Sequence, residues 1–173
     1  MRLELGKEET SRIFAILERV LFLKDLYLFR NVDTERLSIV AEIAREVTVA
    51  PGEIVAKEHE IGESLYIIKE GSLRIMKEKD GTAYNLKNIT SGECLGVSDI
   101  FNDKPRAAGA IANERTVLFE IRRNEFKKVL IGNPEIAYNM LEILSERLNE
   151  MDDEIVLLNK VLRESISAGN AAV

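Results

Sequence analysis

Glycines recur at almost constant intervals through the middle of this chain. The intervals are 10, 9, 10 and 11 residues in the set Gly52, Gly62, Gly71, Gly81 and Gly92. The β-rich runs between and after them are Ile54–Ala56, Leu65–Lys69, Leu73–Met76, Tyr84–Ile89 and Thr116–Ile121. Turns at this spacing are typical of antiparallel all-β sandwiches and barrels. The pair Asp80-Gly81 also predicts a tight hairpin between the runs around Ile75 and Leu86.

Helical periodicity flanks this β-rich zone. Before it, apolar side chains recur at helical intervals in two sets: Ile13, Leu17, Val20 and Leu21, then Leu37, Val40, Ala41 and Ala44. Asn31 or Asp33 is placed to cap the second of these helices. After it, residues 124–131 form a short amphipathic segment that ends at Gly132. The predicted fold is mainly β, an antiparallel, jelly-roll-like β-roll with N-terminal helices and a long C-terminal helix.

The predicted organisation has four parts: N-terminal helices over 1–46, a β-roll with a short helix over 47–132, a C-terminal dimerisation helix over 133–166, and a tail over 167–173. Asn133 can cap the last helix, and Pro134 suits its first turn. A heptad pattern then places apolar residues 3 and 4 apart at Leu141, Leu144, Leu148, Met151, Ile155, Leu158 and Leu162. This pattern predicts a coiled-coil seam. Arg147 and Asp152 take g and e′ positions that favour a parallel homodimer; the alternative is a long helix lying on its own domain.

Composition excludes several classes of protein. The chain has 24 basic and 30 acidic residues, a net charge of −6, and 46% hydrophobic residues. It is therefore neither disordered nor basic enough for nucleic-acid binding in its own right. One cysteine, Cys94, and one histidine, His59, exclude an internal disulfide and a cysteine-rich metal site. No segment has the length of a membrane span or the pattern of a secretory signal, so we expect a cytoplasmic protein without cofactor or membrane partner.

Several motifs occur in an order that resembles a known family. They are Pro51-Gly52-Glu53, the run 61–68, Gly71 and the segment 96–108. Together they resemble the cyclic-nucleotide-binding domain family, which includes the bacterial catabolite activator and the regulatory subunits of cyclic-AMP-dependent kinase. The resemblance covers about residues 22–150, and the segment 104–108 resembles the family's phosphate-binding cassette. It implies a ligand site formed by Gly96, Val97, Ser98, Arg106, Ala107 and Ala108.

The chemistry of this cassette suits a cyclic phosphate. Arg106 can meet its single negative charge with a charge-assisted contact, while Gly96 and the residues after it can offer backbone N–H groups. In the family, a hydroxyl residue just after the arginine favours cyclic GMP, so Ala107 favours cyclic AMP.

Two positions depart from the family pattern. The family's Phe-Gly-Glu, whose glutamate accepts a hydrogen bond from the ribose 2′-hydroxyl, reads Leu95-Gly96-Val97 here. Losing that hydrogen bond is expected to weaken binding roughly ten- to a hundredfold. Asp99 either repels the ligand's phosphate or forms an internal ion pair with Arg106.

Two hypotheses for function follow from these residues. The first is a non-catalytic sensor that binds cyclic AMP and signals through its C-terminal helix to an effector protein. The second is a ligand-independent dimerisation or interaction module in which a carboxylate such as Asp99 neutralises Arg106. No enzyme motif is present. Residues 165–173 leave no room for a helix-turn-helix reading head, so DNA binding of the catabolite-activator type is not expected.

Overall fold

The helices that open the chain form a small layer. The computed structural model describes residues 6–170, with side chains as far as residue 164. Its N-terminal part contains α1 (Lys7–Lys24), a short 3-10 helix, η1 (Tyr27–Phe29), and α2 (Thr34–Ile43). Of the two predicted caps of α2, Asp33 is the one used, because its carboxylate accepts a hydrogen bond from the Arg36 backbone N–H at 2.9 Å.

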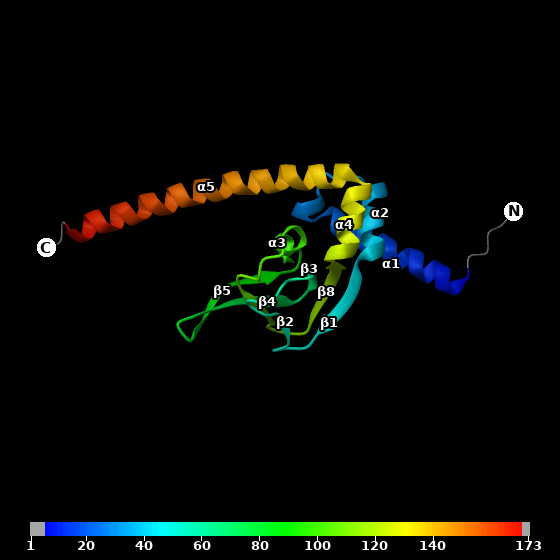
Figure 1. The fold of residues 1–173 in the computed structure, drawn as a ribbon, viewed down its shortest axis with the longest axis horizontal. Helices are drawn as coiled ribbons and strands as arrows, with labels where there is room; N and C mark the ends of the chain where they lie inside the picture. Colours follow the sequence, from blue (N-terminus) through cyan, green and yellow to red (C-terminus); the bar gives the residue numbers. More distant parts are fainter. Residues whose placement is uncertain (1–5, 171–173) are drawn as a thin grey trace.

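Two four-stranded antiparallel sheets form the β-roll (Figure 1). One has the order β1-β8-β3-β6, formed by β1 (Arg45–Val49), β8 (Thr116–Arg122), β3 (Ser64–Glu70) and β6 (Cys94–Leu95). The other has the order β2-β7-β4-β5, formed by β2 (Ile54–Ala56), β7 (Gly109–Ala112), β4 (Ser72–Lys79) and β5 (Thr82–Thr90). The predicted mainly β fold with flanking helices is confirmed.

The predicted hairpin joins β4 to β5. Asp80 and Gly81 have φ angles of 53° and 73°, the two positive values that a type I′ turn requires. All five predicted runs lie within strands, whereas β1, β6 and β7 were not predicted. β6 has only two residues, and β7 reads Gly-Ala-Ile-Ala, which is poor in strand-forming side chains. β1 starts at Arg45, two residues before the predicted start of the β-roll.

The core has two parts because strands point alternate side chains to opposite faces. On β3, Leu65 and Ile67 join a cluster shared with the helices, while Ile68 joins a second cluster between the sheets. Tyr66 packs against this second cluster from the same face of the strand. β3 therefore separates the helical layer from the interior of the roll.

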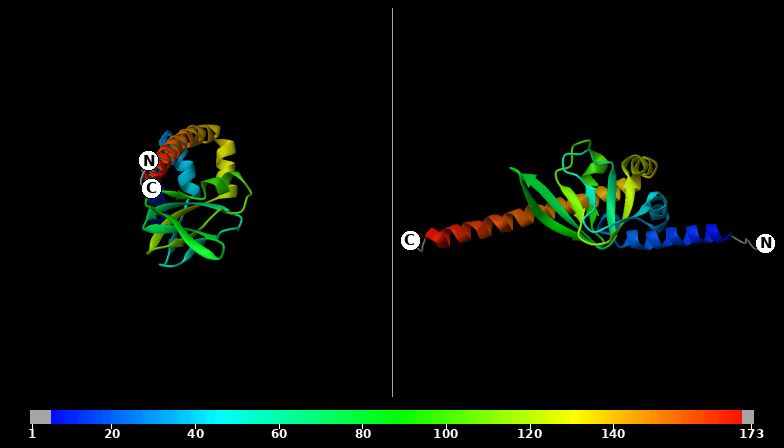
Figure 2. Two further views of the ribbon diagram at one scale, coloured as in Figure 1. Left: turned by 90° about the vertical axis from the view of Figure 1, so that its left-hand side faces the viewer. Right: turned by 90° about the horizontal axis from the view of Figure 1, so that it is seen from below.

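The chain ends in two helices, α4 (Arg123–Gly132) and α5 (Pro134–Asn170). α5 buries Ile136, Met140 and Ile143 against its own domain and then extends beyond the β-roll (Figures 1 and 2). Residues 167–170, predicted as part of a tail, continue this helix, while residues 171–173 lie outside the described residues. None of the helices among the described residues combines the length and apolarity needed to cross a bilayer.

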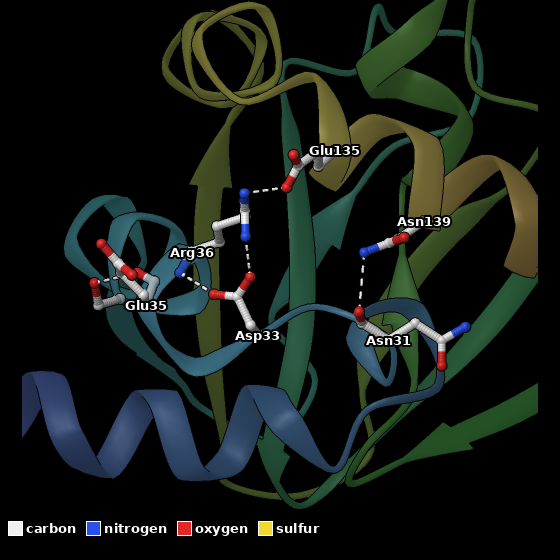
Figure 3. A network of polar contacts seen from close by, with 7 residues as sticks. Asn31, Asp33, Glu35, Arg36, Glu135 and Asn139 are labelled. Carbon is white, nitrogen blue, oxygen red and sulfur yellow. Dashed lines mark hydrogen bonds and ion pairs between the residues drawn. The ribbon is translucent and has the colours of Figure 1, made fainter.

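Polar contacts fix the start of α5 on the N-terminal helices (Figure 3). The Arg36 side chain pairs with both Asp33 and Glu135, joining the start of α2 to the first turn of α5. The Asn139 amide donates to the Asn31 carbonyl at 2.9 Å. One turn further along, the Tyr27 hydroxyl donates to the carbonyl of Ile143 at 3.0 Å. A movement of α5 on its domain must break or shift these contacts.

Candidate functional site

A cavity of about 670 Å³ opens between the inner face of the first sheet, the loop 57–63 and the first turn of α4. Its wall carries four cations and four carboxylates. The lining residues are Val55, Ala56, Lys57, Glu60, Ile61, Glu63, Ser64, Tyr66, Arg106, Glu120, Arg122, Arg123, Asn124 and Glu125. Because cationic and carboxylate side chains both line the cavity, its wall can offer hydrogen-bond donors and acceptors to a polar ligand.

The segment 96–108, named the cassette from here on, reaches this cavity through Arg106. It contains the short helix α3 (Val97–Phe101) and the loop that leads to β7. Gly96 has a φ angle of 86°, and a Cβ there would stand 2.7 Å from the Ser64 carbonyl oxygen, so only glycine fits. The Arg106 N–H donates to the Glu60 carbonyl, and the His59 N–H donates to the Arg106 carbonyl, each at 2.9 Å. The cassette is thereby joined to the loop 57–63.

Arg106 forms a buried ion pair with Asp99. Its Nε lies 3.0 Å from Asp99 Oδ2, and the two side chains are 8% and 9% exposed. Its Nη2 donates to the Ser64 carbonyl at 3.4 Å, and its Cζ lies 5.8 Å from the centre of the Tyr66 ring. Its Nη1 is buried without a hydrogen-bond partner among the described residues. Arg106 therefore keeps an unsatisfied donor group, Nη1, beside the cavity. Buried polar groups rarely lack a hydrogen-bond partner.

The Asp99 carboxylate occupies a small space between two glycines. A Cβ at Gly62 would collide with this carboxylate, and one at Gly96 would stand 2.9 Å from Asp99 Oδ2. The carboxylate thus fills the space beside the Nε of Arg106. The sequence leaves two roles open for Asp99, repulsion of a ligand's phosphate or an internal ion pair with Arg106. The structure contains the internal ion pair.

A second polar group lies on the inner face of β3 and β8. Tyr66 and Glu120 are paired across the two strands, and the Ser64 hydroxyl donates to Glu120 Oε1 at 2.8 Å. Burial raises the pKa of the Tyr66 hydroxyl, with a further rise from Glu120, so this hydroxyl stays protonated and can donate. Ser64 contacts Glu120 through its side chain and Arg106 through its carbonyl.

The six residues predicted to form the ligand site lie in different surroundings. Arg106 alone among them lines the cavity. Val97 packs against the core shared with the helices, and Ala108 packs against the core between the sheets. Ser98 and Ala107 are exposed. Sequence reasoning missed Ser64, Tyr66 and Glu120. Tyr66 and Glu120 are polar residues among apolar ones in two predicted runs, which was the available signal, and Ser64 lies just before the first of these runs.

The single cysteine and the single histidine of the chain differ in burial. Cys94 packs partly buried against the core shared with the helices, and burial raises the pKa of its thiol to about 12. His59 is 81% exposed. Among the described residues, no group of three or more His, Cys, Asp and Glu side chains is arranged to hold a metal ion.

The sequence model of the cyclic nucleotide-binding domain matches residues 46–133, just over half of the chain. The chain belongs to this family. It is similar to the cAMP-dependent protein kinase regulatory subunit of Blastocladiella emersonii, with 26% identity over 123 residues that cover 70% of this chain. This chain spans only 30% and 28% of the length of the first curated relatives it matches.

Solved structures of this cyclic nucleotide-binding domain family share the fold. The catabolite activator protein of Thermus thermophilus has 25% identity and a TM-score of 0.67, covering 77% of this chain and 63% of that protein. The regulatory subunit of a cAMP-independent protein kinase A from Trypanosoma brucei has 22% identity and a TM-score of 0.67, covering 79% and 48%. The second likeness shows the fold alone.

Proposed function

We propose that this chain is a non-catalytic sensor domain that binds a cyclic nucleotide in the cavity beside Arg106 and signals through α5. The observation that carries the proposal is the buried, unpartnered Nη1 of Arg106 at the wall of a cavity of about 670 Å³. A cyclic phosphate would supply the missing acceptor and a negative charge. Arginine binds such oxyanions with charge-assisted hydrogen bonds.

The cassette favours cyclic AMP over cyclic GMP. By resemblance to the family, a hydroxyl residue after the arginine would favour cyclic GMP, and Ala107 has none. Because Asp99 already holds the Nε of Arg106 at 3.0 Å, the phosphate must displace the Asp99 carboxylate or bind beside it. Two anions beside one guanidinium repel each other, so we expect weaker binding than in a domain without Asp99.

Signalling would begin at the wall of the cavity, because that wall includes the first turn of α4. The Arg123 side chain donates to the carbonyls of Gly62 and Asn102 and pairs with Asp103. A single residue of α4 therefore holds both the loop 57–63 and the residues that directly follow α3. A ligand that shifts either segment would move α4 and, through Asn133, α5. The ligand must favour one arrangement in free energy for this coupling to work.

The output surface is the exposed part of α5. Its heptad residues Leu148, Met151, Ile155, Leu158 and Leu162 are 46–63% exposed. Residues 134–166 hold eight acidic and three basic side chains, which makes this helix acidic. We propose that two chains pair through this seam as a parallel homodimer, and that the acidic outer face meets an effector protein.

Titration calorimetry with cyclic AMP and cyclic GMP tests the sensor proposal. Binding is expected for the parent chain, tighter for cyclic AMP, with loss in Arg106→Ala. Arg12→Ala, on α1 away from the cavity, is the matched control and should bind like the parent. No heat and no thermal shift at millimolar ligand would refute the sensor. Equal affinity in Arg106→Ala would place the ligand elsewhere.

The Asp99–Arg106 ion pair also favours a second candidate function, a ligand-independent interaction module. In that case the internal carboxylate permanently takes the place of the ligand's phosphate, and Val97 adds to the loss because it offers no hydrogen-bond acceptor. Asp99→Asn separates the two functions. If the parent binds nothing and the variant binds cyclic AMP, the native pair is a block and the second function holds.

A further inference from the structure

One carboxylate in the cavity has a different setting from the others. Glu120 lies half-buried on the inner face of β8, a central strand of its sheet. Its Oε1 accepts a hydrogen bond from the Ser64 hydroxyl at 2.8 Å. A half-buried carboxylate normally has a cation or several donors around it.

The remaining lining carboxylates are paired or lie in solvent. Glu60 pairs with Lys57 at 3.1 Å, and Glu125 Oε1 pairs with Arg45 at 2.7 Å, while Glu125 Oε2 is buried without a hydrogen-bond partner among the described residues. Glu63 is exposed at the rim. No ion pair is formed by Glu120 within the part of the chain that the structure describes. Glu120 thus retains acceptor capacity that faces a cavity rather than bulk water.

A single residue, Ser64, links Glu120 to Arg106 by hydrogen bonds. The Ser64 carbonyl accepts from Arg106 Nη2 at 3.4 Å, and the Ser64 hydroxyl donates to Glu120. Tyr66, across from Glu120 in the sheet, has its ring 5.8 Å from the Arg106 guanidinium carbon. The cavity therefore has a donor end at Arg106 and an acceptor end at Glu120, with Ser64 and Tyr66 between them.

We propose that Glu120, with Ser64 and Tyr66, forms a hydroxyl-binding subsite that accepts a hydrogen bond from the ribose 2′-hydroxyl of the ligand. This inference rests on the proposed function and deepens it. Val97 offers no acceptor and packs against the core shared with the helices instead of lining the cavity. The sugar must find its acceptor elsewhere. Asp99 is already paired with Arg106, whereas the half-buried Glu120 is linked to that arginine through a single residue, Ser64, and is free of ion pairs among the described residues.

The test compares cyclic AMP with 2′-deoxy cyclic AMP by calorimetry, in the parent chain and in Asp99→Asn. If Glu120 accepts the hydroxyl, the deoxy ligand binds about ten- to a hundredfold more weakly, the effect of one charge-assisted hydrogen bond. In Glu120→Gln this difference should fall to less than about threefold. Glutamine still accepts from Ser64, so the strand pairing is kept, and a thermal melt checks the fold.

Glu70→Gln is the matched control, because it removes the same charge from the exposed end of β3, outside the cavity. It should keep the full preference for cyclic AMP. Equal binding of both ligands by the parent, or an unchanged preference in Glu120→Gln, would overturn the subsite while leaving the sensor function intact. Failure of both ligands to bind the parent and Asp99→Asn would overturn the function and the subsite together.

Discussion

Arg106 and Asp99 form an ion pair inside the cassette, with Nε and Oδ2 3.0 Å apart and both side chains more than nine-tenths buried. Removing two charges from water is costly, so such a pair adds little net stability over an apolar pair. Breaking it from one side is different, because the remaining charge is left buried without compensation. The cassette is therefore held in shape by the same contact that would compete with the proposed ligand.

Asp99→Asn should separate these two effects. Without ligand, the free energy of unfolding should fall by about 3–5 kcal/mol, the usual loss when one partner of a buried pair is removed. Affinity for cyclic AMP should rise because the phosphate no longer competes with a carboxylate. Thermal melts with and without ligand measure both, and the ligand should raise the melting temperature more in the variant than in the parent.

The control for this prediction is Asp153→Asn, an exposed carboxylate on α5. It removes the same charge from the chain but leaves the cassette untouched, so both stability and affinity should match the parent. A destabilised Asp99→Asn that gains no affinity would show that the pair is structural and does not stand in for an anion.

Arg123→Lys should weaken the coupling between the ligand cavity and α5 more than it weakens the binding of cyclic AMP. Lysine can still pair with Asp103, but it lacks the planar fork whose Nη1 pairs with Asp103 while its Nη2 donates to the carbonyls of Gly62 and Asn102. We expect affinity for cyclic AMP within about threefold of the parent, because lysine keeps the positive charge at this wall of the cavity. Hydrogen exchange in α4 and α5 should then respond less to ligand. Arg122→Lys, at the neighbouring position, should respond like the parent; an equal response in Arg123→Lys would contradict the route.

Much of the fold was readable from the sequence because turn chemistry is local. The Asp80-Gly81 turn and the capping by Asp33 depend on residues a few positions apart, and both formed as predicted. The short strand β6 was missed because its pairing comes from distant partners, since Cys94 pairs with Ile67 in β3. A two-residue strand has too little pattern of its own to signal such a partner.

The site was harder to predict because its walls come from several elements. The resemblance led to Arg106, and the structure places this residue at the cavity. Glu120 lies in β8 and meets Ser64 only through strand pairing, 56 positions apart in the sequence. The direction of Val97, towards the helical core, follows from the local turn at Gly96. Neither relationship can be read from spacing alone.

Leu158→Asn should prevent pairing of two chains without harming the domain. Leu158 is 62% exposed in the single chain and occupies a d position of the heptad seam, so a polar residue there costs the monomer little. Light scattering coupled to size exclusion should show a dimer for the parent and a monomer for the variant. Lys160→Asn, at an f position outside the seam, should remain dimeric. A monomeric parent at high micromolar concentration would refute the seam.

Cys94 should be inert in the native protein and reactive once it unfolds. Burial, with a smaller contribution from Glu93, raises the pKa of its thiol to about 12 from an ordinary value of 9.0. Only the thiolate attacks alkylating reagents, so iodoacetamide at pH 8 should react slowly with the folded chain and rapidly in denaturant. Fast labelling of the folded chain would show that the thiol is exposed.

The same shift makes stability depend on alkaline pH. Because the folded pKa is raised, the unfolded chain releases this proton first, and the free energy of unfolding declines as pH rises through the window from about 9 to about 12. Urea unfolding at pH 8 and pH 10.5 measures the decline, and Cys94→Ala should show less of it than the parent. An identical decline in both would mean that other groups, such as lysines and tyrosines, carry the whole effect.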